Sequence, residues 1–149
     1  MAIDDLIPFF EPRSVAVVGA SADPESVGHA ILKNLLFGDM EGTERGEGFG
    51  GAVHAVNRKG GEILGQPVVA RLAALDETPE LVVVAIPPPH VPDVIEEAGV
   101  LGSRAVIVIS AGFAEMGAEG KALQERCAAL ARRHGMRLIG PNCLGVLRP

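Results

Sequence analysis

Apolar runs rich in valine and isoleucine alternate along the chain with segments whose apolar residues return at helical spacing. The runs predict strands at residues 14–20, 51–56, 80–86, 104–110 and 136–140. The helical spacing predicts helices at residues 27–37, 91–99 and 119–134, with a short helical piece at 71–75. Unbroken apolar strands that alternate with helices are typical of parallel sheets covered on both faces. We therefore expect an α/β fold with a doubly wound, mostly parallel sheet and helices on both faces.

The length and charge of the chain narrow the functions that such a fold can have. A chain of 149 residues suits one compact unit, so we expect residues 1–149 to form a single domain. The formal net charge is -6, and lysine and arginine form no basic run with interleaved aromatic residues, which argues against a nucleic-acid partner. A glycine-rich, acidic stretch at residues 38–51 predicts a mobile surface loop.

The cysteines and the longest apolar runs add expectations about metals and membranes. Cys127 and Cys143 do not have the spacing of a metal-ligand motif, so we expect two thiols and no bound metal. The amino-terminal apolar run is too short for a signal peptide, and the other runs fall far below the length that spans a membrane. We therefore expect a cytoplasmic protein with no membrane partner.

The loop after the first predicted strand is the first candidate for ligand binding, because doubly wound sheets bind ligands at the carboxyl ends of their strands. Gly19 ends that strand, and Ser21 and Asp23 are potential caps for the helix that follows. Free amides and the dipole at a helix start favour a phosphate. However, Ser21 stands where the dinucleotide fingerprint has its second glycine, and the next glycine comes only at Gly28. The loop is thus either a phosphate site or an ordinary capped helix start.

The loop after the second strand carries two adjacent cations. Dinucleotide-binding domains for NAD or FAD usually have an acidic residue here for the ribose hydroxyls. This chain instead has Asn57, Arg58 and Lys59. A cationic pair suits a ribose that carries an extra phosphate, either the 2′-phosphate of NADP or the 3′-phosphate of coenzyme A. The alternative is a solvated basic turn.

The remaining strands also end in stiff or small residues. The sequence "AIPPPH" places three prolines after the central strand, and we expect the carbonyls of Ile86 and Pro87 to be free for a ligand. Pro89 could equally stop the strand and open the next helix. Residues 109–117 and 139–145 contain the small residues that a close backbone approach requires, although both could be simple turns.

Together these loops resemble one known family. The motifs that carry the resemblance are, in order, "VAVVGAS", "VVVAIPPP", "VIVISAGFAEMG" and "RLIGPNCLGVLRP", with the "VN.K" and "LG.PV" segments after the first. From about Phe9 to Pro149 the chain resembles the coenzyme A-binding domain of the NDP-forming acyl-CoA synthetases. That superfamily includes the α subunit of succinyl-CoA synthetase and the ADP-forming acetyl-CoA synthetases. The resemblance implies a Rossmann-like domain.

The resemblance also assigns roles to residues on each loop. The first loop would wrap the phosphates of the coenzyme with Gly19, Ala20, Ser21, Ala22, Asp23 and Pro24. The nucleotide end would meet Lys59, beside Asn57 and Arg58. The coenzyme would be lined further by Ile86, Pro87 and Pro88, and its pantetheine arm by Ser110, Ala111 and Gly112. The thioester end would lie toward Asn142 and Cys143.

In the reaction that this resemblance implies, an acyl-CoA, phosphate and ADP give an acid, coenzyme A and ATP through a phosphohistidine. The family's histidine belongs to a domain that follows the "GPNC" motif, and no histidine of this chain has a matching position; they are His29, His54, His90 and His134. We therefore expect no catalytic residue here, and no turnover by this chain alone. Its expected partners are a CoA thioester and downstream synthetase domains or a subunit, and an oligomer is possible.

Three other functions remain open from the sequence. The same coenzyme domain begins protein lysine acetyltransferases in which a synthetase-like region senses the ligand. Arg58 and Lys59 would also suit an NADP-binding oxidoreductase domain. A stand-alone coenzyme-binding regulator is the third. Titration with acetyl-CoA, CoA and NADPH would separate the NADP-binding domain from the others.

Overall fold

One sheet of seven strands organises the part of the chain that the structure describes. This computed structural model describes residues 3–38 and 48–146, so most of the expected loop at 38–51 lies outside the described residues. The strand order is β3-β4-β2-β1-β5-β6-β7, and every neighbouring pair is parallel except β3 with β4. The strands are β1 (Ser14–Val18), β2 (Ala52–Val56), β3 (Gly61–Ile63), β4 (Gln66–Val69), β5 (Leu81–Val84), β6 (Ala105–Val108) and β7 (Arg137–Ile139). The predicted α/β, mostly parallel sheet is confirmed.

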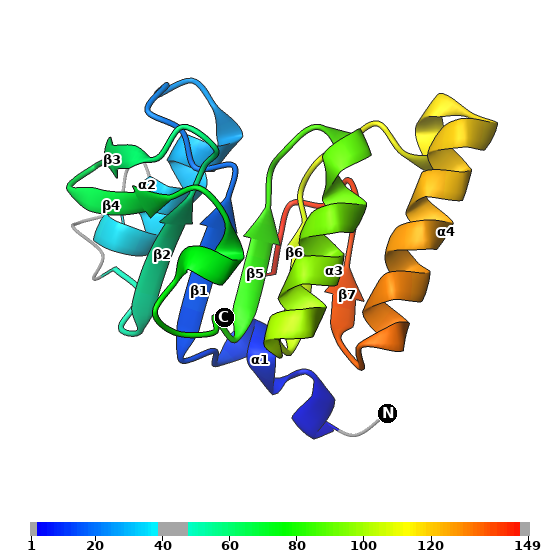
Figure 1. Cartoon of the computed structure of the whole chain (residues 1–149), viewed down its shortest axis with the longest axis horizontal. Coiled ribbons are helices and arrows are strands. Elements are labelled where there is room, and N and C mark those ends of the chain that lie inside the picture. Colours follow the sequence, from blue (N-terminus) through cyan, green and yellow to red (C-terminus); the bar gives the residue numbers. More distant parts are fainter. Residues whose placement is uncertain (1–2, 39–47, 147–149) are drawn as a thin grey trace.

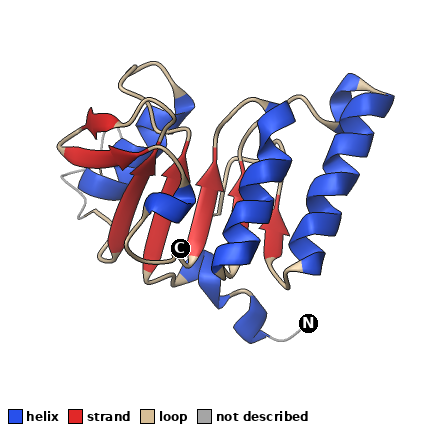
Figure 2. Cartoon of the chain, in the orientation of Figure 1, coloured by secondary structure: helices blue, strands red, loops and turns tan. Residues whose placement is uncertain are grey.

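Helices cover the two faces of the sheet, as Figures 1 and 2 show. The helices are α1 (Ile7–Phe10), α2 (Val27–Phe37), α3 (Val91–Leu101) and α4 (Ala118–Arg133). Short 3-10 turns occupy Ile3–Asp5, Leu72–Ala74, Pro88–His90 and Ala114–Met116. In Figure 1, α3 and α4 lie in front of the sheet and α2 lies behind it. None of the helices within residues 3–38 and 48–146 has the length and apolar character needed to cross a lipid bilayer.

The core follows from the alternation of side chains along the central strands. Val82 and Val84 of β5 pack on the face that α3 and α4 cover, together with the fully buried Ile95 and Phe113. Alternate residues such as Val17 point to the other face, where Leu32 of α2 is fully buried. Because both faces are covered, β5 and β6 are apolar at every position and β1 at every position after Ser14, which is why their sequence reads as unbroken runs.

A buried acid joins three of these strands at their amino ends. The Glu80 carboxylate, which is 9% exposed, accepts a hydrogen bond from the Arg13 backbone N–H at 2.8 Å and one from Arg104 Nη1 at 3.0 Å. The Glu80 backbone N–H donates to Ser14 Oγ at 3.0 Å. Residue 80 therefore connects the starts of β1, β5 and β6, at the amino ends of the strands and opposite the candidate site.

The β3–β4 hairpin is absent from the sequence-based prediction. It turns through Leu64 and Gly65, both with positive φ, at 51° and 78°. Leucine is unusual at such a turn position, and Pro67 argues against an inner strand because it cannot donate a ladder hydrogen bond. Here Pro67 faces Glu62 of the edge strand β3, while Val68 and Val69 pair with β2. The hairpin therefore extends the sheet beyond β2 by two strands.

Candidate functional site

A cavity opens where the strand order reverses. The chain passes from β1 to β2 on one side and later returns to β5 on the other, so the carboxyl ends of these strands border a crevice. The cavity there has a volume of about 690 Å³. Eight of the residues expected to bind the ligand line it, namely Gly19, Ala20, Ser21, Asn57, Arg58, Lys59, Ile86 and Pro87. The structure thus brings together the loops after β1, β2 and β5.

The turn after β1 is packed so closely that only glycine fits. Gly19 has a φ of 98°, and a Cβ on it would lie 2.2 Å from the Ala85 carbonyl oxygen. A Cβ on Gly28 in α2 would lie 1.9 Å from the Gly19 carbonyl oxygen. The end of β5 and the first turn of α2 therefore hold the turn from two sides, and the backbone itself forms the wall of the cavity.

The amides of this turn are partly used within the protein. The N–H groups of Gly19 and Ala20 both point to the Val56 carbonyl, at 3.0 and 3.3 Å. Among the described residues, the N–H groups of Ser21 and Ala22 have no such backbone partner. Any phosphate bound to backbone amides here would therefore meet those of Ser21 and Ala22 rather than those of Gly19 and Ala20.

The expectation that Ser21 or Asp23 caps α2 is wrong. The cap is Ser26, whose Oγ accepts a hydrogen bond from the His29 backbone N–H at 3.1 Å. Ser21 Oγ and Asp23 Oδ1 instead accept hydrogen bonds from backbone N–H groups two residues further along, at 3.1 and 3.0 Å. These local bonds form turns that precede the helix, which begins at Val27. The outer residues of this loop are exposed and lie outside the cavity lining: Ala22, Asp23 and Pro24.

The loop after β2 contributes one positioning residue and two cations. The Asn57 side chain donates from Nδ2 to the Ala20 carbonyl at 2.6 Å and accepts from the Lys59 backbone N–H at 2.8 Å. Asn57 therefore connects the first two loops. Arg58 and Lys59 are exposed at the edge of the cavity, and Arg58 Nη2 lies 3.4 Å from His90 Nδ1.

The expectation that the proline loop offers free carbonyls is also wrong. The Ile86 carbonyl accepts a hydrogen bond from Ser110 Oγ at 2.6 Å, and the Ile86 N–H donates to the same oxygen at 3.1 Å. The Pro87 carbonyl accepts from the His90 backbone N–H at 3.1 Å. These groups are engaged because Ser110 follows β6, the strand next to β5, and because the prolines begin a 3-10 turn. What the loop presents to the cavity is mainly apolar surface.

The expected site residues after β6 and β7 do not line the cavity but continue its rim. The Asn142 backbone N–H donates to the Ser110 carbonyl at 2.9 Å, and the Cys143 thiol lies 3.3 Å from the Val108 carbonyl oxygen. Gly112 has a φ of 104°, and a Cβ on it would lie 2.9 Å from Pro88 Cγ. Ala111, between Ser110 and Gly112 in the sequence, is exposed. Since the Ala85 N–H also donates to the Val18 carbonyl at 2.8 Å, a row of strand ends and loops joined by hydrogen bonds runs from Asn57 to Asn142.

Glu115 is the acidic side chain at this end of the rim. Its carboxylate accepts a hydrogen bond from the Gly112 backbone N–H, and this bond holds the pKa of Glu115 below its ordinary value. The group is therefore charged at neutral pH and fixes the loop after β6, which does not suit a proton donor.

The histidines and cysteines mostly have structural partners. His54 pairs with Glu77 and His134 with Glu96, each at 2.8 Å, and only His90 of the four histidines lines the cavity. Both cysteines are free; burial raises the pKa of the Cys127 thiol to about 11. Within the described ranges, no three His, Cys, Asp or Glu side chains gather into a group that could hold a metal ion.

Several cavity residues are missing from the sequence-based prediction. Arg71 follows β4, and Asp93 and Glu97 project from α3. Glu97 Oε1 accepts hydrogen bonds from the Ala73 backbone N–H at 2.7 Å and from Arg71 Nε at 3.3 Å. Gly65, between two short β-prone runs, is a partial signal for the hairpin that brings Arg71 to the site, although Leu64 before it is not a usual turn residue.

Comparisons with known proteins agree with this geometry. A family model described as a CoA binding domain matches residues 13–149. The α subunit of the ADP-forming acetate–CoA ligase I of Pyrococcus furiosus is 40% identical, over 93% of this chain and 29% of that protein. The ADP-forming acetate–CoA ligase I of Archaeoglobus fulgidus is also 40% identical, over 93% of this chain and 18% of that protein.

A solved structure extends the likeness to three dimensions. It is the dinucleotide forming acetyl-coenzyme A synthetase 1 of Ca. Korarchaeum cryptofilum in complex with phosphate and ADP. It shares 34% sequence identity with a TM-score of 0.83, over 96% of this chain and 28% of that chain. The present chain therefore spans less than a third of the length of these relatives.

Proposed function

Because the chain belongs to the CoA-binding domain family, we propose that the cavity between β1, β2 and β5 binds coenzyme A or an acyl-CoA as a substrate. The observation that carries the proposal is the position of this cavity. It lies at the reversal of strand order, between a turn that only glycine can form and a cationic loop. A phosphate-bearing nucleotide suits those two features together.

The proposed placement follows from the groups that remain available. The diphosphate would lie against the turn after β1, near the amides of Ser21 and Ala22. The 3′-phosphate would lie toward Arg58 and Lys59, which are exposed and cationic. The pantetheine arm would follow the rim past Ile86 and the loop after β6, with the sulfur toward the loop after β7. The rim of hydrogen-bonded loops supports this direction.

The role that we assign to the chain is orientation of the coenzyme. Contacts with the nucleotide end lie far from the thioester, so they can position the sulfur without weakening the bond that reacts. We propose that the remaining parts of an ADP-forming acyl-CoA ligase, in downstream domains or a partner subunit, supply the chemistry. Two side chains near the cavity could transfer protons, and each already has a partner within the protein. The Glu115 carboxylate accepts from the Gly112 N–H, and His90, the only histidine among the described residues that lines the cavity, lies against Arg58.

Isothermal titration of the chain with CoA, 3′-dephospho-CoA and NADPH tests this proposal. We expect CoA to bind, and dephospho-CoA to bind about 10- to 150-fold more weakly, because hydrogen bonds to a charged group contribute about 1.5–3 kcal/mol. NADPH should bind more weakly than CoA. Absence of CoA binding at saturating concentration, by calorimetry and by equilibrium dialysis, would refute the proposal, and tighter binding of NADPH would support an oxidoreductase domain instead.

A further inference from the structure

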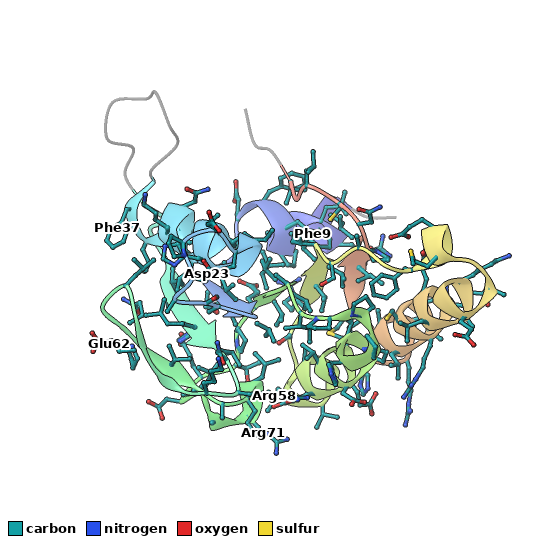
Figure 3. All side chains as sticks on the ribbon, turned by 90° about the horizontal axis from the view of Figure 1, so that it is seen from above. Phe9, Asp23, Phe37, Arg58, Glu62 and Arg71 are labelled. Atoms are coloured by element: carbon teal, nitrogen blue, oxygen red, sulfur yellow. The ribbon has the colours of Figure 1, made fainter. Side chains whose placement is uncertain are left out.

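The cavity has a third cation, Arg71, just after the strand β4 that the sequence-based prediction missed. Val56 of β2 and Val69 of β4 are register partners, and the Asn57 N–H donates to the Val69 carbonyl at 2.9 Å. Arg58 and Arg71 each stand two residues beyond these partners, just after the ends of neighbouring parallel strands that lie about 5 Å apart. Both side chains line the cavity, and Figure 3, which looks down on this edge, labels them on the same side of the molecule.

Glu97 of α3 restrains this third cation. Its Oε1 holds Arg71 through Nε at 3.3 Å and also accepts from the Ala73 N–H at 2.7 Å, while the next residue, Leu72, is buried in the core. A guanidinium held through Nε keeps its two terminal amino groups for another partner. The Arg71 side chain is 67% exposed, so those groups are accessible from the cavity mouth.

The cations and the acids around the cavity lie on opposite sides of it. Arg58, Lys59 and Arg71 come from the ends of β2 and β4, whereas Asp93 and Glu97 come from α3. Arg71 offsets the charge of Glu97, which leaves Asp93 as the acid on the α3 side. A dianion therefore fits against the strand side, where it would relieve the repulsion between Arg58 and Arg71 and could accept paired hydrogen bonds from a guanidinium.

We propose that Arg71, positioned by Glu97, contacts the 3′-phosphate of the coenzyme together with Arg58 and so selects CoA over nucleotides that lack this group. This inference rests on the proposed function, which does not itself involve Arg71 or Glu97. Glu97 acts as a positioning residue, because it fixes the Arg71 side chain and the turn after β4.

The test measures affinity for CoA and for 3′-dephospho-CoA in wild-type chain, Arg71→Met and Arg71→Lys. In Arg71→Met, CoA affinity should fall about 10-fold while dephospho-CoA affinity stays within about twofold. Arg71→Lys should recover part of the preference, because it keeps the charge but loses the paired donors. Arg132→Met, at the exposed end of α4, is the matched control and should leave both affinities unchanged.

Glu97→Gln supplies a readout that separates positioning from folding. The variant retains an oxygen that can accept from the Ala73 N–H but loses the charge that holds Arg71, so the preference for CoA should fall partway with little change in unfolding temperature. Equal losses for both ligands in Arg71→Met would overturn the inference while leaving the proposed function intact. Equal binding of both ligands by the wild-type chain would overturn it as well. Failure of the wild-type chain to bind CoA would instead refute the proposed function.

Discussion

Replacing Gly19 with alanine is expected to abolish measurable CoA binding and to lower the free energy of unfolding by about 2–5 kcal/mol. The added Cβ would lie 2.2 Å from the Ala85 carbonyl oxygen and 2.7 Å from its carbon, so the end of β5 must move. Overpacking of this kind costs about 1–3 kcal/mol. The φ of 98° adds about 1–2 kcal/mol of backbone strain for a residue with a side chain. Urea denaturation and calorimetric titration with CoA would measure the two effects.

A matched glycine separates crowding from backbone strain. Gly102, which ends α3, has a φ of 94°, and a Cβ there would meet no atom within 4 Å. It lies at the opposite edge of the sheet from the cavity. Gly102→Ala should therefore lose only about 1–2 kcal/mol and bind CoA normally. If Gly19→Ala behaved like Gly102→Ala in both measurements, the close packing that we describe around the first turn would be wrong.

Replacing Glu80 with alanine is expected to lower the free energy of unfolding by about 3 kcal/mol at neutral pH. The change removes the acceptor for the Arg13 N–H and for Arg104 Nη1, and each bond to a charged group contributes about 1.5–3 kcal/mol. We place the loss toward the lower end of their sum, because the Arg13 and Arg104 side chains are largely exposed and water screens their charges. CoA affinity should change little, because Glu80 lies at the far edge of the sheet.

The contribution of Glu80 should also depend on pH in one direction. The hydrogen bond from the Arg13 backbone N–H, helped by Arg104, holds the pKa of Glu80 below its ordinary value of 4.5. A lowered pKa stabilises the folded chain above the unfolded-state pKa, and this stabilisation is lost as the pH falls through the folded-state pKa. The stability gap between wild type and Glu80→Ala should therefore narrow below about pH 4.5. Glu62→Ala, on the exposed edge strand β3, is the control, and a gap that stayed constant with pH would contradict this account.

The sequence predicts the central sheet well because its signal is local. The helix at Val27–Phe37 has the predicted bounds, and the runs around Val82 and Val106 form the expected strands. Burial on both faces imposes this pattern on each strand separately, so no knowledge of its neighbours is needed. The β3–β4 hairpin was missed because Leu64 and Pro67 obscure the turn and the strand, respectively.

The details of the site could not be predicted in the same way, because they depend on which loops become neighbours. Ser110 Oγ can donate a hydrogen bond to the Ile86 carbonyl only because β6 pairs with β5 in the observed register. Arg71 reaches the cavity only because β4 pairs with β2, which places two arginines at matching positions. The sequence also does not show whether Asp23 caps α2 or bonds locally; in the structure its carboxylate accepts from the Glu25 N–H, and Ser26 is the cap.

The row of hydrogen-bonded loops has a consequence for the thermodynamics of ligand entry. Asn57 is bonded to Ala20, Ser110 to Ile86, and Asn142 to Ser110, in each case through groups of the protein itself. The receptor is therefore assembled during folding, and little backbone entropy remains to be lost when a coenzyme arrives. The rim backbone should shift by less than about 1 Å on complex formation. Most of the ordering would then fall on the flexible arm of the ligand, so that truncated coenzymes with fewer rotatable bonds should associate with a smaller entropic penalty.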